Sequence, residues 1–308
     1  MKTLKYIFAI LLISISVVSC SDDDDSTSIE VNPVEGLSKI YEISAANHVV
    51  EIYSGKQNLE IGYNEISIRI KDLTTDKYIN DAELSWMPMM NMTDRAHSAP
   101  HSMLSNAEES TVYKGHIVFQ MASNETEYWE LKLNYNLNGE SVEGVTRITV
   151  LQPNDGMVKT QVFMGVDGVK YVLAYVGPQN PEVALNDMQA VLYKMEDMMN
   201  FPVVENFKIT IDPRMPGMGN HSSPNNTDLT YDSVNNMYNG KLSLTMTGYW
   251  KINLKLLNQA GEILKGEDVS KIPVVTDEDF IQINYRELKK QGFDIPESVL
   301  NQADEIIR

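Results

Sequence analysis

Two short segments of the sequence combine methionine with histidine. The residues are Met87, Met89, Met92, His97 and His101 in the first segment, and Met215, Met218 and His221 in the second. Thioether sulfur is a soft neutral ligand and imidazole an intermediate one, so the combination suits copper, above all Cu(I), better than Mg²⁺, Ca²⁺ or Zn²⁺. The sequence therefore predicts a copper-binding protein with these residues as metal ligands.

Methionine is more often a filler of hydrophobic cores than a ligand. We favour that interpretation for six methionines outside the two segments, which are Met121, Met188, Met195, Met198, Met199 and Met246. The methionines of the two segments lie among proline, glycine, asparagine and serine, which predicts loops, where burial is difficult. A flexible hydrophobic contact with a partner protein is the alternative to metal binding.

The two segments belong to a longer internal repeat with a spacing of about 120 residues, the length of an ordinary domain. The matched pairs are Tyr53 with Tyr175, Gly55 with Gly177, Asn64 with Asn186, Met89 with Met215, Gly115 with Gly240, Met121 with Met246, and Trp129 with Trp250. Similarity on both sides of the Met/His segment indicates a tandem duplication of one domain. We name residues 36–152 copy one and residues 157–270 copy two, with the turn formers around Pro153 as the linker.

Short stretches of alternating apolar residues, separated by turn formers, dominate both copies and predict strands. They are residues 66–70, 117–121, 131–133 and 145–150 in copy one, and 207–211, 242–246 and 252–256 in copy two. Gly139 and Gly261 mark two late hairpins. The predicted fold class is all-β, with two tandem immunoglobulin-like β-sandwich domains. Residues 271–308 depart from the repeat and are predicted to form an extension with a short C-terminal helix over residues 294–307.

The Tyr-x-Gly strand, the Met/His segment and the Tyr-Trp strand together resemble the YtkA-like family, which consists of β-sandwich domains of bacterial envelope proteins similar to FixH-type and CopC-like modules. The family's Met-rich segment falls on residues 87–92 and 215–218, and its histidine falls on His97 and His221. Its strand ending in Met, with the Trp strand after it, falls on Met121 with Trp129 and on Met246 with Trp250. Copy one departs from the pattern by placing Met92 five residues before His97, whereas Met218 is three residues before His221. This difference leaves open which residues of copy one coordinate, with Met90, His101 and Met103 as further candidates.

The amino terminus predicts a lipid-anchored protein. Residues 6–18 are an apolar run that follows two lysines and is too short to span a bilayer comfortably, as is typical of a signal peptide. The sequence Val17-Val18-Ser19-Cys20 resembles a bacterial lipobox. We therefore expect residues 1–19 to be removed and Cys20 to be lipidated, which leaves no thiol for a disulfide or a thiolate metal site because Cys20 is the only cysteine.

Four aspartates follow the predicted lipidation site, at residues 22–25, within a tether over residues 20–35. Such an acidic run resembles the signal that sends Bacteroidota-type lipoproteins to the outer face of the outer membrane. We predict an outer-membrane anchor at the cell surface, with a periplasm-facing anchor as the alternative.

Composition and motifs exclude several classes of function. The chain has 43 acidic and 25 basic residues and a formal net charge of -18, which argues against nucleic acid because phosphates require a basic surface. No nucleophile elbow, HExxH or paired-carboxylate motif is present, so we predict that the protein is not an enzyme. We expect copper storage, delivery or resistance, together with an envelope copper-transport or uptake partner. The alternative is a non-catalytic surface interaction protein, namely an adhesin, a spacer or an accessory to glycan uptake.

Overall fold

The structure is a computed structural model that describes residues 32–137, 139–154, 157–265, 271–275, 282–283 and 305–306. Residues 33–308 fall into one compact unit. The predicted signal peptide, Cys20 and the acidic run at 22–25 lie outside the described residues, and so does most of the predicted C-terminal helix. Of that helical segment the structure describes Glu305–Ile306, which is a strand.

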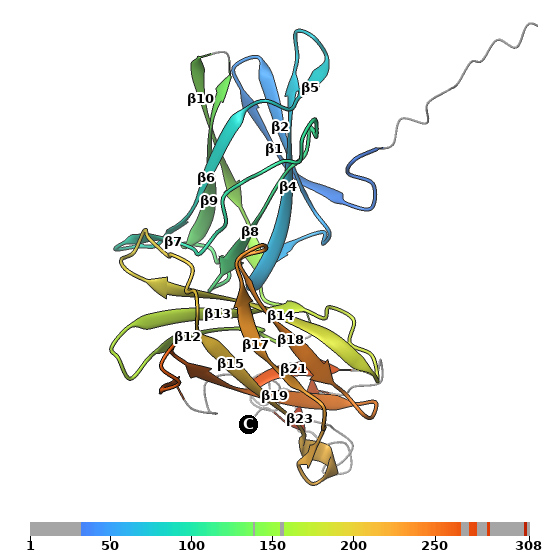
Figure 1. The fold of residues 1–308 in the computed structure, drawn as a ribbon. Helices are drawn as coiled ribbons and strands as arrows, with labels where there is room; N and C mark the ends of the chain where they lie inside the picture. The colour runs from blue at the N-terminus through green and yellow to red at the C-terminus, as the bar shows by residue number, and fades with distance from the viewer. Residues whose placement is uncertain are drawn as a thin grey trace, which may run out of the picture. The chain divides into compact units, whose positions relative to one another are not determined.

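Copy one is built from eleven strands. They are β1 (Ser38–Ala45), β2 (His48–Ser54), β3 (Leu59–Glu60), β4 (Gly62–Asp72), β5 (Lys77–Ile79), β6 (Glu83–Asn91), β7 (Ala96–Ser98), β8 (Tyr113–Phe119), β9 (Tyr128–Leu137), β10 (Glu140–Ile148) and β11 (Val150–Leu151). One antiparallel sheet has the order β1-β2-β4-β5, with β8 also paired to β4 (Figure 1). The other has the order β10-β9-β6-β7 and is also antiparallel, while β3 and β11 form a short parallel pair.

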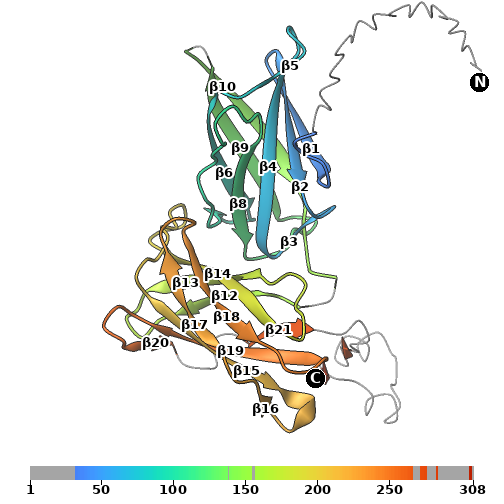
Figure 2. The same cartoon turned by 45° about the vertical axis from the view of Figure 1, so that its right-hand side comes forward.

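The rest of the described chain contains twelve strands and one short 3-10 helix, η1. They are β12 (Thr160–Met164), β13 (Lys170–Gly177), β14 (Leu185–Met195), β15 (Lys208–Met215), η1 (Pro216–Met218), β16 (His221–Ser222), β17 (Thr227–Asp232), β18 (Met237–Ser243), β19 (Tyr249–Leu257), β20 (Ile263–Lys265), β21 (Lys271–Val275), β22 (Gln282–Ile283) and β23 (Glu305–Ile306). One sheet follows the order β12-β13-β14-β18-β17-β15-β19-β20, with β16 on β15 and β21 on β19 (Figure 2). Strand β17 pairs with both β18 and β15. It thereby joins two groups of strands whose counterparts in copy one form separate sheets.

The strands follow the alternation of the sequence. In β9 the buried residues Trp129, Leu131, Leu133 and Tyr135 alternate with more exposed ones, which is the period of a strand with one face on a core. Copy one and copy two each enclose their own cluster of buried apolar side chains. The prediction of an all-β, sandwich-type fold is confirmed. Because residues 33–308 form one compact unit, the division into two domains stays a prediction.

Two strands end earlier than the sequence pattern predicts. Strand β8 ends at Phe119 rather than at Met121, and β18 ends at Ser243 rather than at Met246. The backbone after each strand instead supports a tryptophan, because Trp129 Nε1 donates to the Met121 carbonyl (3.0 Å) and Trp250 Nε1 donates to the Met246 carbonyl (3.1 Å). Both methionines are therefore placed beside the tryptophan of their own copy.

An asparagine motif sets the same register in both copies. Asn64 Oδ1 accepts from the Glu60 amide and its Nδ2 donates back to the Glu60 carbonyl (3.0 and 2.7 Å). Asn186 makes the same pair of bonds with Glu182 (both 2.9 Å). Asn64 and Asn186 lie near the start of β4 and β14, which have 11 residues each, so the two asparagines serve as the origin for comparing the copies position by position.

Candidate metal centre

The predicted methionine loops are mainly strands. Met87 and Met89 lie in β6, and Met215 is the last residue of β15. The prolines Pro88 and Pro213 favoured the prediction of loops, because proline has no backbone N–H with which to pair inside a sheet. Both occupy positions where only one neighbouring strand pairs with the backbone, at Leu131 and Ile252. Proline is compatible with such a strand edge, so the loop prediction is wrong for these three methionines.

The strand register corrects the match between the two segments. Pro88 pairs with Leu131 and Met90 with Trp129 in copy one. In copy two, Pro213 pairs with Ile252 and Arg214 with Lys251, which puts Met215 beside Trp250. Met215 is therefore the counterpart of Met90, whereas the sequence match had aligned it with Met89.

A row of methionine, histidine and tryptophan crosses three neighbouring strands in each copy. Met90 pairs with His97 on β7, and Met215 pairs with His221 on β16. The ring centroids of His97 and Trp129 are 5.6 Å apart at 88°, and those of His221 and Trp250 are 6.3 Å apart at 57°. We call these the Met-His-Trp rows. An indole attracts cations through its π face, so an ion bound to either histidine would have an aromatic neighbour.

In copy one the histidine is held in a form that can bind a metal. His97 Nδ1 lies 2.7 Å from the Ser98 carbonyl oxygen, and because a carbonyl only accepts, Nδ1 must carry the proton. The lone pair of the ring then lies on Nε2, the atom that can bind a metal. Metal-binding histidines usually donate their other ring N–H to a carbonyl or carboxylate oxygen in this way. Ser98 also donates from Oγ to the Met87 sulfur (3.1 Å), so Met87 is engaged in the hairpin rather than directed to His97.

In copy two the equivalent site is open to solvent. His221 is exposed and Met218 is 59% exposed on η1, whereas Met215 is buried at 4% exposure. Gly219 follows η1 with φ 63°, a left-handed conformation that glycine adopts without strain. The predicted residues Met215 and His221 are thus neighbours, and Met218 is presented three residues before His221 on a separate turn.

His101 does not join His97. Its Nδ1 donates to the Ala99 carbonyl (2.7 Å), and its ring meets Trp86 edge-on at 6.5 Å. It lines a different cavity, of about 690 Å³, with Met103 and His116. Burial lowers the pKa of His101, and burial together with the neighbouring His101 lowers the pKa of His116 to about 4. Both histidines are therefore neutral at physiological pH. His116 Nε2 forms a hydrogen bond with Tyr193 Oη (2.6 Å).

A smaller cavity, of about 290 Å³, is lined by His97 and by four methionines. We call it the methionine cavity. The soft ligands in its wall are Met92, His97, Met121, Met195 and Met198. From sequence we predicted Met92 and His97 as ligands but took Met121, Met195 and Met198 for core filler. The exposure of Met198, at 43%, shows that it is not core filler, and its position after β14 in a polar turn was the available signal.

Within the described residues, no three or more His, Cys, Asp and Glu side chains gather in a way that could hold a metal ion. Among the helices of the described part of the chain, none has the length and apolar character needed to cross a membrane.

Comparison with known proteins yields no family. No protein-family model and no curated protein matches the chain. Among solved structures, the chain is similar to a DUF4785 family protein from Legionella pneumophila, with 11% identity and a TM-score of 0.25, over 75% of this chain and 57% of that chain. The chain thus spans little more than half the length of that protein, and a likeness this weak carries no argument about function. The resemblance to the YtkA-like family stays a prediction.

Proposed function

We propose that the protein is a lipid-anchored envelope protein that binds Cu(I) through its two Met/His segments, for copper storage, delivery or resistance. The observation that carries this proposal is the Met-His-Trp row, which recurs at equivalent strand positions in both copies. An ordinary core methionine does not require a histidine beside it on the neighbouring strand. Repetition of the pair beside an indole favours a shared role in binding a soft cation.

Neutral ligands suit Cu(I) in an oxidising compartment. A free thiol would be lost to disulfides there, whereas a thioether remains a ligand until it is oxidised to the sulfoxide. The predicted lipid anchor at Cys20 would place the site in the envelope, and two copies in tandem would carry one ion each.

The test is anaerobic titration of residues 26–308, which contain the whole compact unit 33–308, with Cu(I) under reducing conditions. We expect about two equivalents to bind, because each copy has its own Met-His-Trp row. Replacing Met215 and Met218 by Leu and His221 by Gln should leave about one equivalent. Met103→Leu is the control, because Met103 is 89% exposed and lies in neither row.

Two results would overturn the copper proposal. One is tighter binding of Zn²⁺ than of Cu(I), since Zn²⁺ gains little from thioethers. The other is intact Cu(I) binding after every methionine of both segments is changed to Leu. Either result would favour the alternative of a non-catalytic surface interaction protein.

The envelope location has its own test. Cys20→Ala should release the protein from the membrane fraction, because lipid at this cysteine is the predicted attachment. Deletion of residues 22–25 should keep the protein in that fraction but remove its accessibility to protease on intact cells. Unchanged protease accessibility would contradict surface export and favour the periplasm-facing anchor.

A further inference from the structure

We infer that the Cu(I) ion of copy one is held in the methionine cavity by ligands from both copies, with Met195 and Met198 of copy two completing the site around His97. This inference rests on the proposed function and deepens it. Met92, His97 and Met121 come from copy one, whereas Met195 ends β14 and Met198 lies in the turn after it. Copy one thus supplies three of the five soft ligands, and copy two supplies the other two.

The turn that carries Met198 is fixed beside His97. The Ser98 amide donates to the Met198 carbonyl (2.8 Å), which links the residue after His97 directly to the turn. Within the turn, Asp197 Oδ1 accepts from the amides of Met199 and Asn200 (2.6 and 2.9 Å). These bonds order the backbone before any ion binds, and such preorganisation lowers the entropic cost of binding.

The sulfur and imidazole groups of the cavity wall favour a soft ion over a hard one. Arg95 and Lys170 in the same wall add positive charge, which repels a doubly charged ion more than a singly charged one. Among the described residues no carboxylate lines the cavity, and the remaining wall residues are Arg95, Gln120, Val162, Lys170, Val172 and Phe201. Mg²⁺ and Ca²⁺ require oxygen ligands, mostly carboxylates, so this wall does not suit them.

A second observation points to an occupant of the cavity. Gln120 Oε1 is buried and has no hydrogen-bond partner among the described residues, and Gln120 lines the same cavity. An unpartnered buried acceptor is costly and calls for an explanation. This oxygen does not face the cavity directly, and a rotation of the Gln120 side chain would bring it to a cation bound there. The carbonyl of the neighbouring residue, Met121, accepts from the same Trp129 that meets His97.

The experiment isolates the site of copy one. The starting protein is residues 26–308 with Met215→Leu, Met218→Leu and His221→Gln, so that only copy one binds. Competition with a chromophoric Cu(I) chelator then measures the affinity of this protein and of its Met195→Leu/Met198→Leu variant. Leu conserves volume and apolar character, and thermal unfolding verifies that the variant folds. We expect the affinity to fall roughly ten- to one hundred-fold, as when a metal site loses a supporting group.

Met199→Leu is the matched control, since Met199 is adjacent to Met198 and 42% exposed but does not line the cavity. It should leave the affinity unchanged. X-ray absorption at the copper edge should show fewer sulfur neighbours in the double variant than in the control.

The outcomes distinguish failure of the cross-copy site from failure of the proposed function. If His97→Gln abolishes tight binding but the double variant binds as well as the control, the cross-copy site is overturned and the proposed function stands. If the starting protein binds no Cu(I) but unaltered residues 26–308 do, the site of copy one is overturned and copy two still supports the proposed function. If neither protein binds Cu(I), the proposed function fails and the inference fails with it.

Discussion

The outer faces of two equivalent sheets have opposite character in the two copies. With Asn64 and Asn186 as origin, Ile68 corresponds to Ala190. Ile52 pairs with Ile68 in copy one and Tyr175 pairs with Ala190 in copy two, so the neighbours Glu51 and Ala174 are counterparts. The sequence match had aligned Tyr53 with Tyr175, but a register shift between Tyr175 and Gly177 moves the alignment by one residue. Because successive residues of a strand face opposite sides, that shift exchanges the core face for the outer face.

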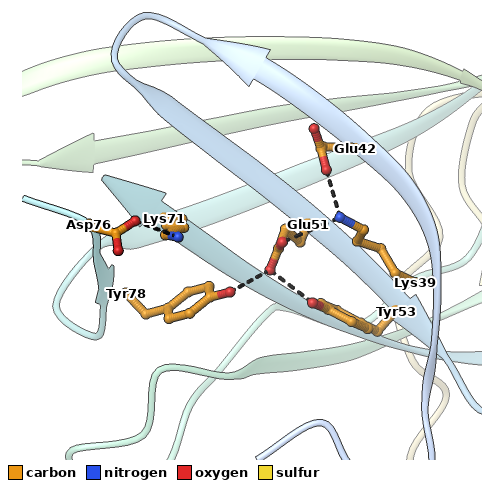
Figure 3. Close-up of polar contacts among 7 residues, drawn as sticks. All are labelled: Lys39, Glu42, Glu51, Tyr53, Lys71, Asp76 and Tyr78. Carbon is orange, nitrogen blue, oxygen red and sulfur yellow. Dashed lines mark hydrogen bonds and ion pairs between the residues drawn. The ribbon is translucent and has the colours of Figure 1, made fainter. Parts of the chain in front are cut away.

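In copy one the outer face is a polar network centred on Glu51 (Figure 3). Glu51 Oε2 accepts from Tyr53 and Tyr78 (2.8 and 3.0 Å), and Lys39 lies 3.4 Å from Oε1. Arg69 stacks over the Tyr78 ring at 3.2 Å from its centroid. Burial raises the pKa of Glu51, but these hydrogen bonds and the Lys39 charge outweigh burial and hold the pKa below its ordinary value.

In copy two the same face is apolar and covered. Val172, Ala174, Val191 and Tyr193 are at most 1% exposed and form one cluster with Val118 of copy one and Phe201. Equivalent strands of the two copies thus use one face differently, one as a solvated polar surface and the other as a buried contact. The difference shows that burial on the second face of a sheet depends on what packs there, not on the strand itself.

The largest expected effect comes from giving copy two the charge that copy one has. Ala174→Glu would bury a carboxylate without the tyrosine donors that serve Glu51. We expect the free energy of unfolding to fall by about 3–5 kcal/mol, as for an uncompensated buried charge, measured by urea denaturation. Leu185→Glu on the adjacent strand β14 is the control, because Leu185 is 56% exposed and should change stability by less than about 0.5 kcal/mol. Equal effects of both changes would show that the face of copy two is not covered in solution.

A second comparison concerns the methionines of the two Met/His segments. Met90 is fully buried, whereas Met218 is 59% exposed. Met90→Ala should lower the free energy of unfolding of the metal-free protein by about 2–5 kcal/mol through lost burial and a cavity. Met218→Ala should change it by less than about 0.5 kcal/mol. A small loss for Met90→Ala would indicate that this end of β6 is not packed as the structure shows.

The alternation of apolar residues was enough to predict the all-β fold, because a strand with one solvated face leaves a clear period of two. It failed at residues 87–89, where a proline on a strand edge resembles a loop. The covered face of copy two did leave a signal, namely the unbroken apolar run at residues 171–176, which is typical of a strand buried on both faces.

The candidate site was predictable only in part, because its ligands come from segments far apart in the sequence. Met92 and His97 lie in one hairpin and could be found from their spacing. Met195 and Met198 come from copy two, and no local pattern indicates that they meet His97. Equally, the choice between Met89 and Met90 as counterpart of Met215 required the strand register, because the sequence match tolerates a shift of one residue.

A smaller effect should follow from removing the charge at the centre of the polar network. Because the pKa of Glu51 is lowered on folding, its contribution to stability is present above the unfolded value of about 4.5 and is lost as the pH falls through the folded value. Glu51→Gln should lower the free energy of unfolding by about 1–2 kcal/mol at neutral pH, and this difference from wild type should shrink below about pH 4.5. Glu42→Gln, at a side chain that is 47% exposed, should have less effect. If the difference in stability between Glu51→Gln and wild type does not change with pH, the charge of Glu51 is not its cause.

The smallest expected effect concerns the partner of that carboxylate. Burial and the hydrogen bond to Glu51 raise the pKa of Tyr53 to about 12. A group with a raised pKa stabilises the fold fully below its unfolded value, here about 10, and the contribution is lost as the pH rises through about 12. Tyr53→Phe should cost about 1 kcal/mol at neutral pH through the lost bond, and the gap to wild type should close between about pH 10 and pH 12. Val176→Ala, at the register shift between Tyr175 and Gly177 in copy two, removes no ionisable group, so its effect should be the same at both ends of that range. Urea denaturation at the two pH values measures both variants, and a gap that persists at pH 12 for Tyr53→Phe would show that the bond to Glu51 does not determine the alkaline stability of copy one.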